Sequence, residues 1–382
     1  MTTHDRWLLP DGIEELLPVA AAKVEQLRRQ LLDLYGSWGY QLVIPPLVEF
    51  TESLLIGLGS DIELLTFRVT DQISGRSMGI RADITPQVAR IDAHSLAQEG
   101  VSRLCYAGEV LHTRQTSLLA SRSPIKLGAE LYGDPSLQAD LEVISLMLET
   151  MTTAGVPRVI LDLGHVGIYR ALLHGSGLDE AQEQAVFDAL QRKSLPDLGD
   201  ALQAVSNQQR RQQILELAGM HGDETVLQNI PYADAAVAEL REVSGAIARR
   251  YPAVEIYFDL GELRGYHYHT GLVFAAYVPG HGQAVANGGR YDDVGQVFGR
   301  ARPATGFNTD LKALLEILAG SLAVPETVAI SAPAQGDAAL WELVAELRAG
   351  GEVVISSSSG EIDPRCDRQL RSREGKWKVE KC

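Results

Sequence analysis

The residues most able to do chemistry gather in one short loop. Residues 264–271 read Arg-Gly-Tyr-His-Tyr-His-Thr-Gly, so a cation, two tyrosines and two histidines stand within eight positions. His267 and His269 are two residues apart and could share a metal ion, but no third ligand stands nearby in the sequence, which disfavours a metal site. The side chains of this loop can otherwise offer hydrogen bonds and positive charge to a ligand.

Generic catalytic signatures are missing from the sequence. It contains neither a Gly-x-x-x-x-Gly-Lys phosphate loop nor a His-Glu-x-x-His zinc helix. The stretch Gly57–Gly59 lacks the third glycine of a dinucleotide fingerprint and is interpreted as a turn. His165, His174 and His221 have no second histidine or cysteine at metal-ligand spacing, so we expect them on the surface or in the core. No metal or cofactor is expected.

Composition is typical of an ordinary globular protein. The 382 residues are 45% hydrophobic and 22% charged. No apolar run reaches the length of a membrane span, and the N-terminus lacks the basic start and apolar core of a secretory signal. Cys105, Cys366 and Cys382 are odd in number and form no Cys-x-x-Cys pair. This pattern favours a reducing cytoplasm over a disulfide framework.

The charge balance disfavours nucleic acid as a partner. The formal net charge is −16, which opposes binding of a polyphosphate over a broad face. The most basic stretch, residues 365–381, has seven Lys and Arg against three Asp and Glu, but only one aromatic residue, Trp377. Single strands favour basic grooves with interleaved aromatic side chains. We therefore expect neither a nucleic-acid nor a membrane partner.

Hydrophobic spacing predicts the elements that must position the loop. A helix is expected over Val19–Trp38 after Pro18, followed by a strand over Tyr40–Ile44. A second helix is expected over Ala139–Thr152, and its methionines are interpreted as core residues. Further strands are expected at Ser77–Arg81, Leu104–Leu111, Leu127–Tyr132 and Val159–Leu163.

The second half of the chain is expected to be helical before it returns to strands. Residues 167–252 are mostly amphipathic and show no chemistry. Strands at Val254–Asp259 and Leu272–Val278 flank the glycine-containing loop, which is typical of an antiparallel sheet. After residue 320 we expect a strand at Thr327–Ser331, a helix at Asp337–Arg348 and a second strand at Glu352–Ile355. A short hairpin is expected at Arg371–Val379.

Three motifs together resemble those of histidyl-tRNA synthetase. Residues 264–271 share five of eight positions with the Arg-Gly-Leu-Asp-Tyr-Tyr-Thr-Gly pattern of that family, and Gly288–Asp292 and Gly306-Phe307 match its later motifs. The resemblance implies an α+β fold, with a class II synthetase-like antiparallel sheet flanked by helices over residues 1–320. It also implies a helical insertion at about 167–252, and a short α/β segment at 321–382 in place of a longer anticodon-binding domain.

The same resemblance implies a pocket for histidine. Arg81–Thr85 resembles the family's Arg-x-Glu-x-Thr segment, so Asp83 and Thr85 would face the α-amino group of the ligand. Taken alone, these two residues favour a helix cap. Glu130 would accept a hydrogen bond from the imidazole. The implied pocket consists of Asp83, Thr85, Glu130, Arg264, Tyr268, His269 and Tyr291.

The sequence departs from the family where the family binds ATP. His112 and Arg114 stand at the positions of an ATP-binding Arg and a Glu, and Lys312-Ala313 replaces Glu-Arg. A mostly neutral imidazole cannot replace the charged fork of a guanidinium. The loss of one such donor typically costs about 10²–10³ in rate, so histidine activation is predicted to be negligible. Lys126 stands where the family has Gln, which brings a cation towards the ligand's ammonium.

A histidine pocket without nucleotide chemistry resembles the regulatory subunits of ATP phosphoribosyltransferase, which are paralogues of the synthetase. The resemblance implies a non-catalytic subunit that joins short-form catalytic subunits in a hetero-octamer. It also implies a requirement in the first step of L-histidine biosynthesis, feedback regulation by L-histidine, and self-association through the N-terminal helix and strand. Two alternatives stay open: a stand-alone histidine sensor, and an active histidine-activating enzyme.

Overall fold

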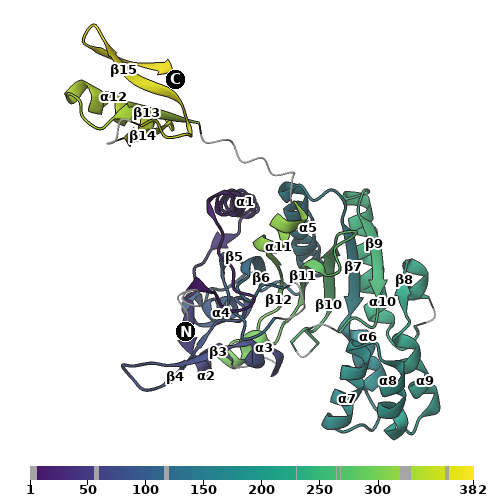
Figure 1. The fold of residues 1–382 in the computed structure, drawn as a ribbon. Coiled ribbons are helices and arrows are strands. Elements are labelled where there is room, and N and C mark those ends of the chain that lie inside the picture. Colours follow the sequence, from purple (N-terminus) through teal and green to yellow (C-terminus); the bar gives the residue numbers. More distant parts are fainter. Residues whose placement is uncertain are drawn as a thin grey trace. The chain divides into compact units, whose positions relative to one another are not determined.

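The computed structural model describes residues 7–55, 60–115, 120–228, 230–263, 265–266, 268–318, 328–357 and 361–382. The chain divides into two compact units (Figure 1). Unit 1 is Met1–Leu322, and unit 2 is Ala323–Cys382. Two residues of the predicted loop, Arg264 and His267, lie outside the described residues.

Unit 1 is built on a nine-stranded sheet with the order β1-β5-β6-β12-β11-β10-β7-β9-β8. The strands β1 and β5 pair in parallel, as do β7 and β9, and every other neighbouring pair is antiparallel. The predicted antiparallel sheet is therefore confirmed for the central strands. The strands are β1 (Gln41–Leu42), β5 (Ser102–Glu109), β6 (Ile125–Tyr132), β7 (Ile160–His165), β8 (His221–Gly222), β9 (Glu255–Asp259), β10 (Leu272–Tyr277), β11 (Ala284–Arg290) and β12 (Ala304–Asp310).

One strand prediction differs from the structure. The strand expected over Tyr40–Ile44 is only the two-residue β1, and Pro45 and Pro46, which follow Ile44, cannot donate to a ladder. The strands β9 and β10, which flank the glycine-containing loop, run in opposite directions, and β7 lies between them.

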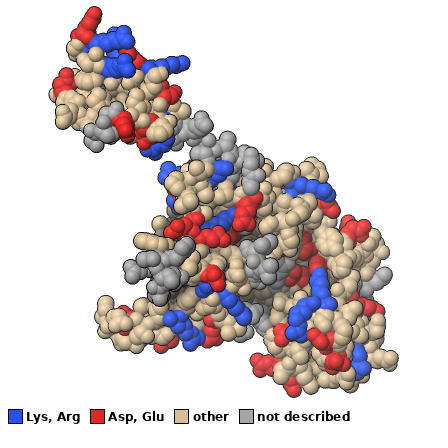
Figure 2. Space-filling view, in the orientation of Figure 1, with Lys and Arg blue, Asp and Glu red and all other residues tan. Residues whose placement is uncertain are grey.

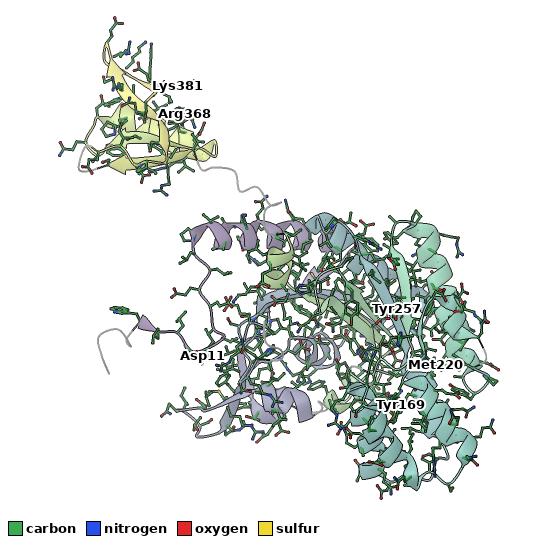
Figure 3. The ribbon with its side chains drawn as sticks, turned by 45° about the vertical axis from the view of Figure 1, so that its right-hand side comes forward. Asp11, Tyr169, Met220, Tyr257, Arg368 and Lys381 are labelled. Carbon is green, nitrogen blue, oxygen red and sulfur yellow. The ribbon has the colours of Figure 1, made fainter. Side chains whose placement is uncertain are left out.

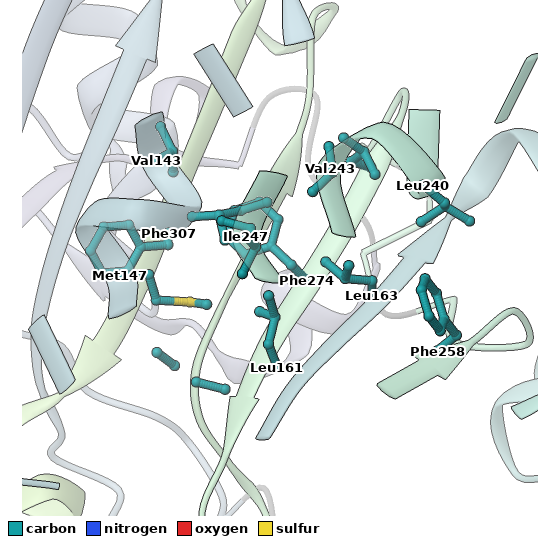
Figure 4. Close-up of a cluster of buried hydrophobic side chains, with 14 of the residues drawn as sticks. Val143, Met147, Leu161, Leu163, Leu240, Val243, Ile247, Phe258, Phe274 and Phe307 are labelled. Atoms are coloured by element: carbon teal, nitrogen blue, oxygen red, sulfur yellow. The ribbon is translucent and has the colours of Figure 1, made fainter. Parts of the chain in front are cut away.

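Helices cover the sheet and close the main core. The helices α1 (Pro18–Ser37), α5 (Leu137–Ala154), α10 (Asp234–Arg250) and α11 (Leu311–Ile317) bury their apolar faces against it. Figure 4 shows Met147 of α5 and Ile247 of α10 beside Phe274 of β10. Each of these side chains is at most 3% exposed, and the burial of one such side chain is worth roughly 1.5–3 kcal/mol. The methionines of α5 are core residues, as predicted.

A small second sheet and several short helices complete the part of unit 1 that carries the N-terminus. The sheet has the order β2-β4-β3. Its strands and the neighbouring helices are β2 (Val48–Phe50), α2 (Thr51–Leu54), α3 (Ser60–Leu65), β3 (Phe67–Thr70), β4 (Ser77–Ile80), α4 (Thr85–Arg90) and the π-helical turn Ile91–Leu96. The helix α4 follows β4, the central strand of this small sheet, after a short connection.

The segment predicted to be helical begins directly after β7. It contains α6 (Val166–Leu173), α7 (Glu180–Gln191), α8 (Leu195–Ala201) and α9 (Gln208–Leu217), with short 3₁₀ turns at Leu202–Ala204 and Glu224–Leu227. The helices α7, α8 and α9 lie together at one side of unit 1 (Figure 1), and Tyr169 of α6 lies beside them (Figure 3). The last helix of the segment, α10, instead packs on α5 and β7. Its position makes it part of the main core.

Unit 2 is a small α/β fold of its own. Its four-stranded sheet has the order β14-β13-β15-β16 and is covered by α12 (Ala338–Ala349). The strands are β13 (Ala329–Pro333), β14 (Val353–Ser357), β15 (Cys366–Arg373) and β16 (Lys376–Lys381). Ile330, Leu340, Val344 and Leu370 form its core. The C-terminal hairpin is longer than the predicted Arg371–Val379 and carries Arg368 and Lys381 (Figure 3).

Candidate functional site

A buried carboxyl group lies at the centre of the candidate site. Glu130 of β6 is 1% exposed, and three hydroxyl groups contact it. Thr85 Oγ1 lies 3.0 Å and Tyr106 Oη 3.1 Å from Oε1, while the Tyr291 hydroxyl donates to Oε2. Burial raises the pKa of Glu130 to about 8, and the hydroxyl donors only partly oppose this shift. The carboxyl is therefore mostly protonated at neutral pH.

Two glycines make room for this cluster within the sheet. Gly306 of β12 is paired with Glu130, and a Cβ atom there would lie 1.6 Å from Glu130 Oε2. Gly128 of β6 is paired with Tyr106, and a Cβ atom there would lie 2.4 Å from the Tyr106 hydroxyl. Only a residue without a side chain fits at either position. The antiparallel register thus sets both the approach of the hydroxyls and the space for the carboxyl.

The segment Asp83–Thr85 does not form the helix cap that the two residues favour when taken alone. Thr85 is the first residue of α4, whose N-cap is Ile84, and no side chain caps the helix. The Thr85 hydroxyl donates to Glu130 instead, and Asp83 Oδ1 accepts from the Ile84 amide at 2.8 Å. The start of α4 therefore delivers a hydroxyl to the buried carboxyl.

The pocket loop, defined as residues 265, 266 and 268–271, lies beside this cluster. Its His269 is 6% exposed and its Nδ1 lies 3.2 Å from the Arg290 carbonyl oxygen. Because burial lowers the pKa of His269 to about 4, the ring is neutral and Nδ1 carries the hydrogen that it donates. The His269 ring centroid lies 4.5 Å from that of Tyr268 and 6.4 Å from that of Tyr291. The predicted residue Arg264 lies outside the described residues.

The strand end that carries Tyr291 is fixed by a buried ion pair. Arg290 donates to Asp140 Oδ2 through Nη2 at 2.7 Å and through Nε at 3.0 Å, and both side chains are at least nine-tenths buried. Removal of one partner of such a pair leaves an uncompensated buried charge, so the geometry is strongly held. Arg290 therefore has a structural task, and Tyr291 next to it faces Glu130.

A small cavity of about 30 Å³ lies between the pocket loop and the sheet. Glu262, Tyr268, His269, Asn287 and Gly288 are among the residues that line it. This volume is about that of one water molecule. Tyr268 and His269 of the pocket loop line the cavity, whereas Glu130 and its three hydroxyl partners do not.

Two basic residues on the predicted nucleotide side contact protein oxygen atoms. His112 is 8% exposed, its Nε2 lies 2.9 Å from the Ala82 carbonyl oxygen, and burial lowers its pKa. The Lys312 amine donates to Ser123 Oγ at 3.0 Å. Arg114 lies at an exposed position. On the histidine side, the Lys126 amine donates to Asn308 Oδ1 at 3.1 Å.

Comparison with known proteins identifies the chain. The histidyl-tRNA synthetase family model matches residues 12–314. The chain is 55% identical over 393 aligned residues to an ATP phosphoribosyltransferase regulatory subunit of Pseudomonas aeruginosa, with 99% of each chain covered. It is 52% identical to the regulatory subunit of Thioalkalivibrio sulfidiphilus over the same share of both chains. The chain belongs to the family of ATP phosphoribosyltransferase regulatory subunits.

Membership of this regulatory-subunit family agrees with both units. The model of the HisZ C-terminal domain of ATP phosphoribosyltransferase matches residues 327–380, which form most of unit 2. A regulatory subunit/histidyl-tRNA synthetase structure from Bacillus halodurans is 26% identical with a TM-score of 0.80 and covers 94% of each chain. A histidyl-tRNA synthetase structure from Nostoc is 18% identical with a TM-score of 0.74 and covers 96% of this chain and 91% of its own, which supports the fold alone.

Two negative findings concern only the part of the chain that the structure describes. No described helix combines the length and the apolar character needed to cross a membrane. Within the same residues, no group of three or more His, Cys, Asp or Glu side chains is placed to hold a metal ion. The face of unit 1 in Figure 2 carries acidic and basic side chains side by side.

Sequence reasoning missed Tyr106 and the need for Gly128. Tyr106 lies in a predicted strand and shows no motif of its own, yet its hydroxyl contacts both Glu130 and Thr85. The usable signal was the pair of glycines on the neighbouring strands, at Gly128 and Gly306. Each marks a position where a polar side chain of the adjacent strand crosses the sheet surface.

Proposed function

We propose that this regulatory subunit has no catalysis of its own and binds L-histidine in the pocket around Glu130. Through this binding it transmits feedback regulation to an ATP phosphoribosyltransferase catalytic subunit in the first step of L-histidine biosynthesis. The observation that carries the proposal is the pocket itself: this chain, which matches the histidyl-tRNA synthetase family model, has a buried acid with three hydroxyl partners.

The chemistry of the pocket suits an imidazole. A carboxyl with a pKa of about 8 can accept a hydrogen bond from an N–H or donate one to a bare ring nitrogen, and it can adapt to either tautomer of the ligand. The seven predicted contacts are Asp83, Thr85, Glu130, Arg264, Tyr268, His269 and Tyr291. Asp83 offers a carboxylate for the ammonium group. The Lys126 amine donates to Asn308 Oδ1 at 3.1 Å.

The absence of catalysis is supported by how the basic residues of the nucleotide side are used. Transfer of the adenylyl group from ATP needs donors aimed at the α-phosphate, where negative charge develops in the transition state. His112 and Lys312 are at least nine-tenths buried and bonded to protein oxygen atoms, and Ala313 offers no donor. This arrangement favours regulation over the alternative of an active histidine-activating enzyme.

Partners are inferred from the family and from exposed apolar side chains. We expect assembly with short-form catalytic subunits in a hetero-octamer, and self-association through α1 and β1. The strand β1 lies at one end of the large sheet, and Leu42, Ile44 and Leu47 around it are 49%, 83% and 47% exposed. An exposed apolar sheet edge is a site for association. The three free cysteines fit a reducing cytoplasm.

The deciding experiment measures phosphoribosyl-ATP formation by a short-form catalytic subunit, with and without this chain, over a histidine titration. Activation that histidine reverses supports the proposal. If the chain leaves the rate unchanged, the regulatory role fails. Activation that is insensitive to histidine would support assembly with the catalytic subunit and contradict feedback regulation through the assigned pocket. Pyrophosphate exchange with ATP in the presence of histidine tests the enzyme alternative, and we expect none.

A further inference from the structure

The pocket loop is attached to the first helix of the helical segment by three consecutive carbonyl groups. The Arg170 side chain of α6 donates to the His269 carbonyl through Nη2 at 2.7 Å and to the Thr270 carbonyl through Nη1 at 3.4 Å. The Val166 amide of α6 donates to the Gly271 carbonyl at 3.1 Å. The backbone that carries His269 is thus held by α6 on one side and by the end of β11 on the other, where the Thr270 amide donates to the Arg290 carbonyl at 2.7 Å.

A ring cluster adds a second connection between the loop and the helices. Tyr266 of the loop packs on Tyr169 of α6, with ring centroids 5.0 Å apart, and on Phe187 of α7, with centroids 5.5 Å apart. The Arg170 guanidinium lies 5.3 Å from the centroid of the same Tyr266 ring. Aromatic pairs and cation–π contacts of this kind have preferred geometries, so they fix orientation as well as distance.

This connection is open to solvent. A cleft of about 420 Å³ lies against it and is lined by Arg170, His174, Glu183 and Tyr266, among others. Arg170 is itself exposed, although it is bonded to the loop. Both α6 and α7 therefore contact the loop directly.

We infer that Arg170 is a positioning residue that couples the helices α6 and α7 to the histidine pocket. It sets the position of the pocket loop, so effector affinity depends on these helices, and effector binding changes them in return. The reciprocity follows from thermodynamic linkage. The Arg170 contacts support this role, because Arg170 binds the backbone carbonyl of His269, whose side chain lines the small cavity beside the sheet. The inference rests on the proposed function.

The test uses the full-length chain and L-histidine. Arg170→Met removes all donors but keeps much of the stem, and Arg170→Lys keeps the charge without the fork. Arg192→Met is the matched control, since Arg192 also lies at a helix end in this segment but pairs with Asp197, away from the loop. Histidine affinity is measured by calorimetry. Hydrogen exchange of peptides from α6 and α7 is measured with and without saturating histidine.

We expect Arg170→Met to change histidine affinity by about tenfold, Arg170→Lys to change it less, and Arg192→Met to leave it unchanged. In the wild-type chain histidine should alter exchange in α6 and α7, and Arg170→Met should abolish that response even at saturation. A merely structural residue would lower stability without uncoupling the two regions. Equal affinity and equal exchange in Arg170→Met would overturn the inference.

Two further outcomes keep the inference separate from the proposed function. If the wild-type chain binds no histidine, the proposed function fails and the inference fails with it. If the wild-type chain binds histidine and Arg170→Met behaves like wild type, the inference fails and the proposed function stands. Should Arg170→Met not fold, Tyr266→Leu removes the aromatic contacts to Tyr169 and Phe187 instead. The same loss of response in α6 and α7 is then expected, and a retained response would overturn the coupling.

Discussion

The two sides of the site in unit 1 use their polar groups in opposite ways. On the Glu130 side, hydroxyls from β5, α4 and the end of β11 converge on one buried acid, and glycines keep the space open. On the nucleotide side, His112 and Lys312 donate into the surrounding protein. Under the proposed function, one scaffold keeps recognition of a small molecule and loses the machinery for its activation. The two sets of contacts are made by different residues, so one can change without the other.

The largest effect on stability and histidine binding is expected at Gly306, which leaves space for the Glu130 carboxyl. Gly306→Ala places a Cβ atom 1.6 Å from Glu130 Oε2, so either the carboxyl or β12 must move. Overpacking of this kind typically costs about 1–3 kcal/mol, and we also expect histidine binding to be abolished. Urea unfolding and calorimetry measure the two effects. Gly199→Ala in α8 meets no atom within 4 Å and serves as the control. A stable Gly306→Ala chain that binds histidine normally would contradict the assigned geometry.

Glu130→Gln breaks the recognition side with less disturbance of shape. The amide keeps the size of the acid, but it cannot ionise, and one of its two groups can only donate. A hydrogen bond to a charged group is worth about 1.5–3 kcal/mol, so we expect about 10- to 100-fold weaker histidine binding. Isothermal calorimetry at neutral pH measures it, with Glu25→Gln on the exposed face of α1 as the control. Unchanged affinity in Glu130→Gln would remove Glu130 from the pocket.

The pH dependence of stability sharpens the comparison from the same residue. The pKa of Glu130 is raised from 4.5 to about 8, so the stability it contributes is fully present below pH 4.5 and is lost as the pH rises through 8. The free energy of unfolding of wild type relative to Glu130→Gln should therefore fall across this window, by up to about 1.4 kcal/mol per pH unit. Urea unfolding of both chains over a pH series measures it. Parallel pH profiles of the two chains would show that Glu130 is ionised in the folded protein at neutral pH.

The smallest effect on activity is expected when two arginines are restored on the nucleotide side. The double variant His112→Arg/Ala313→Arg restores the two arginines of the synthetase family. Lys312, the Ala82 carbonyl and Ser123 remain unchanged. We expect histidine-dependent pyrophosphate exchange to remain at background, with a loss of about 1–3 kcal/mol in stability because His112 is 92% buried. Measurable pyrophosphate exchange would mean that the activating site lacks only these two arginines. The contrast between the two sides of the site would then be smaller.

The elements of the fold were more predictable than the meeting of side chains. The helical spacing of Val24, Leu27 and Leu31 predicted α1 because a buried helical face leaves that periodicity in the sequence. The neighbours of β10 could not be predicted, since strand order depends on how the chain returns after a long excursion. Local spacing does not encode that path.

Within the site, motif positions indicated where Thr85, Glu130 and Tyr291 lie, and the structure brings these three together through hydrogen bonds. Their role in histidine binding stays a prediction, as does that of Arg264, which lies outside the described residues. The cap interpretation of Thr85 was wrong because its hydroxyl has a better acceptor across the sheet. Tyr106 was missed because its contribution arises from strand register, which no single stretch of sequence reveals.

The raised pKa of Glu130 has a calorimetric consequence. At neutral pH the Glu130 carboxyl is mostly protonated. Under the proposed function, a histidine that donates an N–H to this carboxyl favours its ionised form, so the proton is released to the solvent. The apparent heat of histidine binding would then vary with the ionisation enthalpy of the buffer. A regulatory subunit built in this way would report the acidity of its surroundings together with the concentration of its effector.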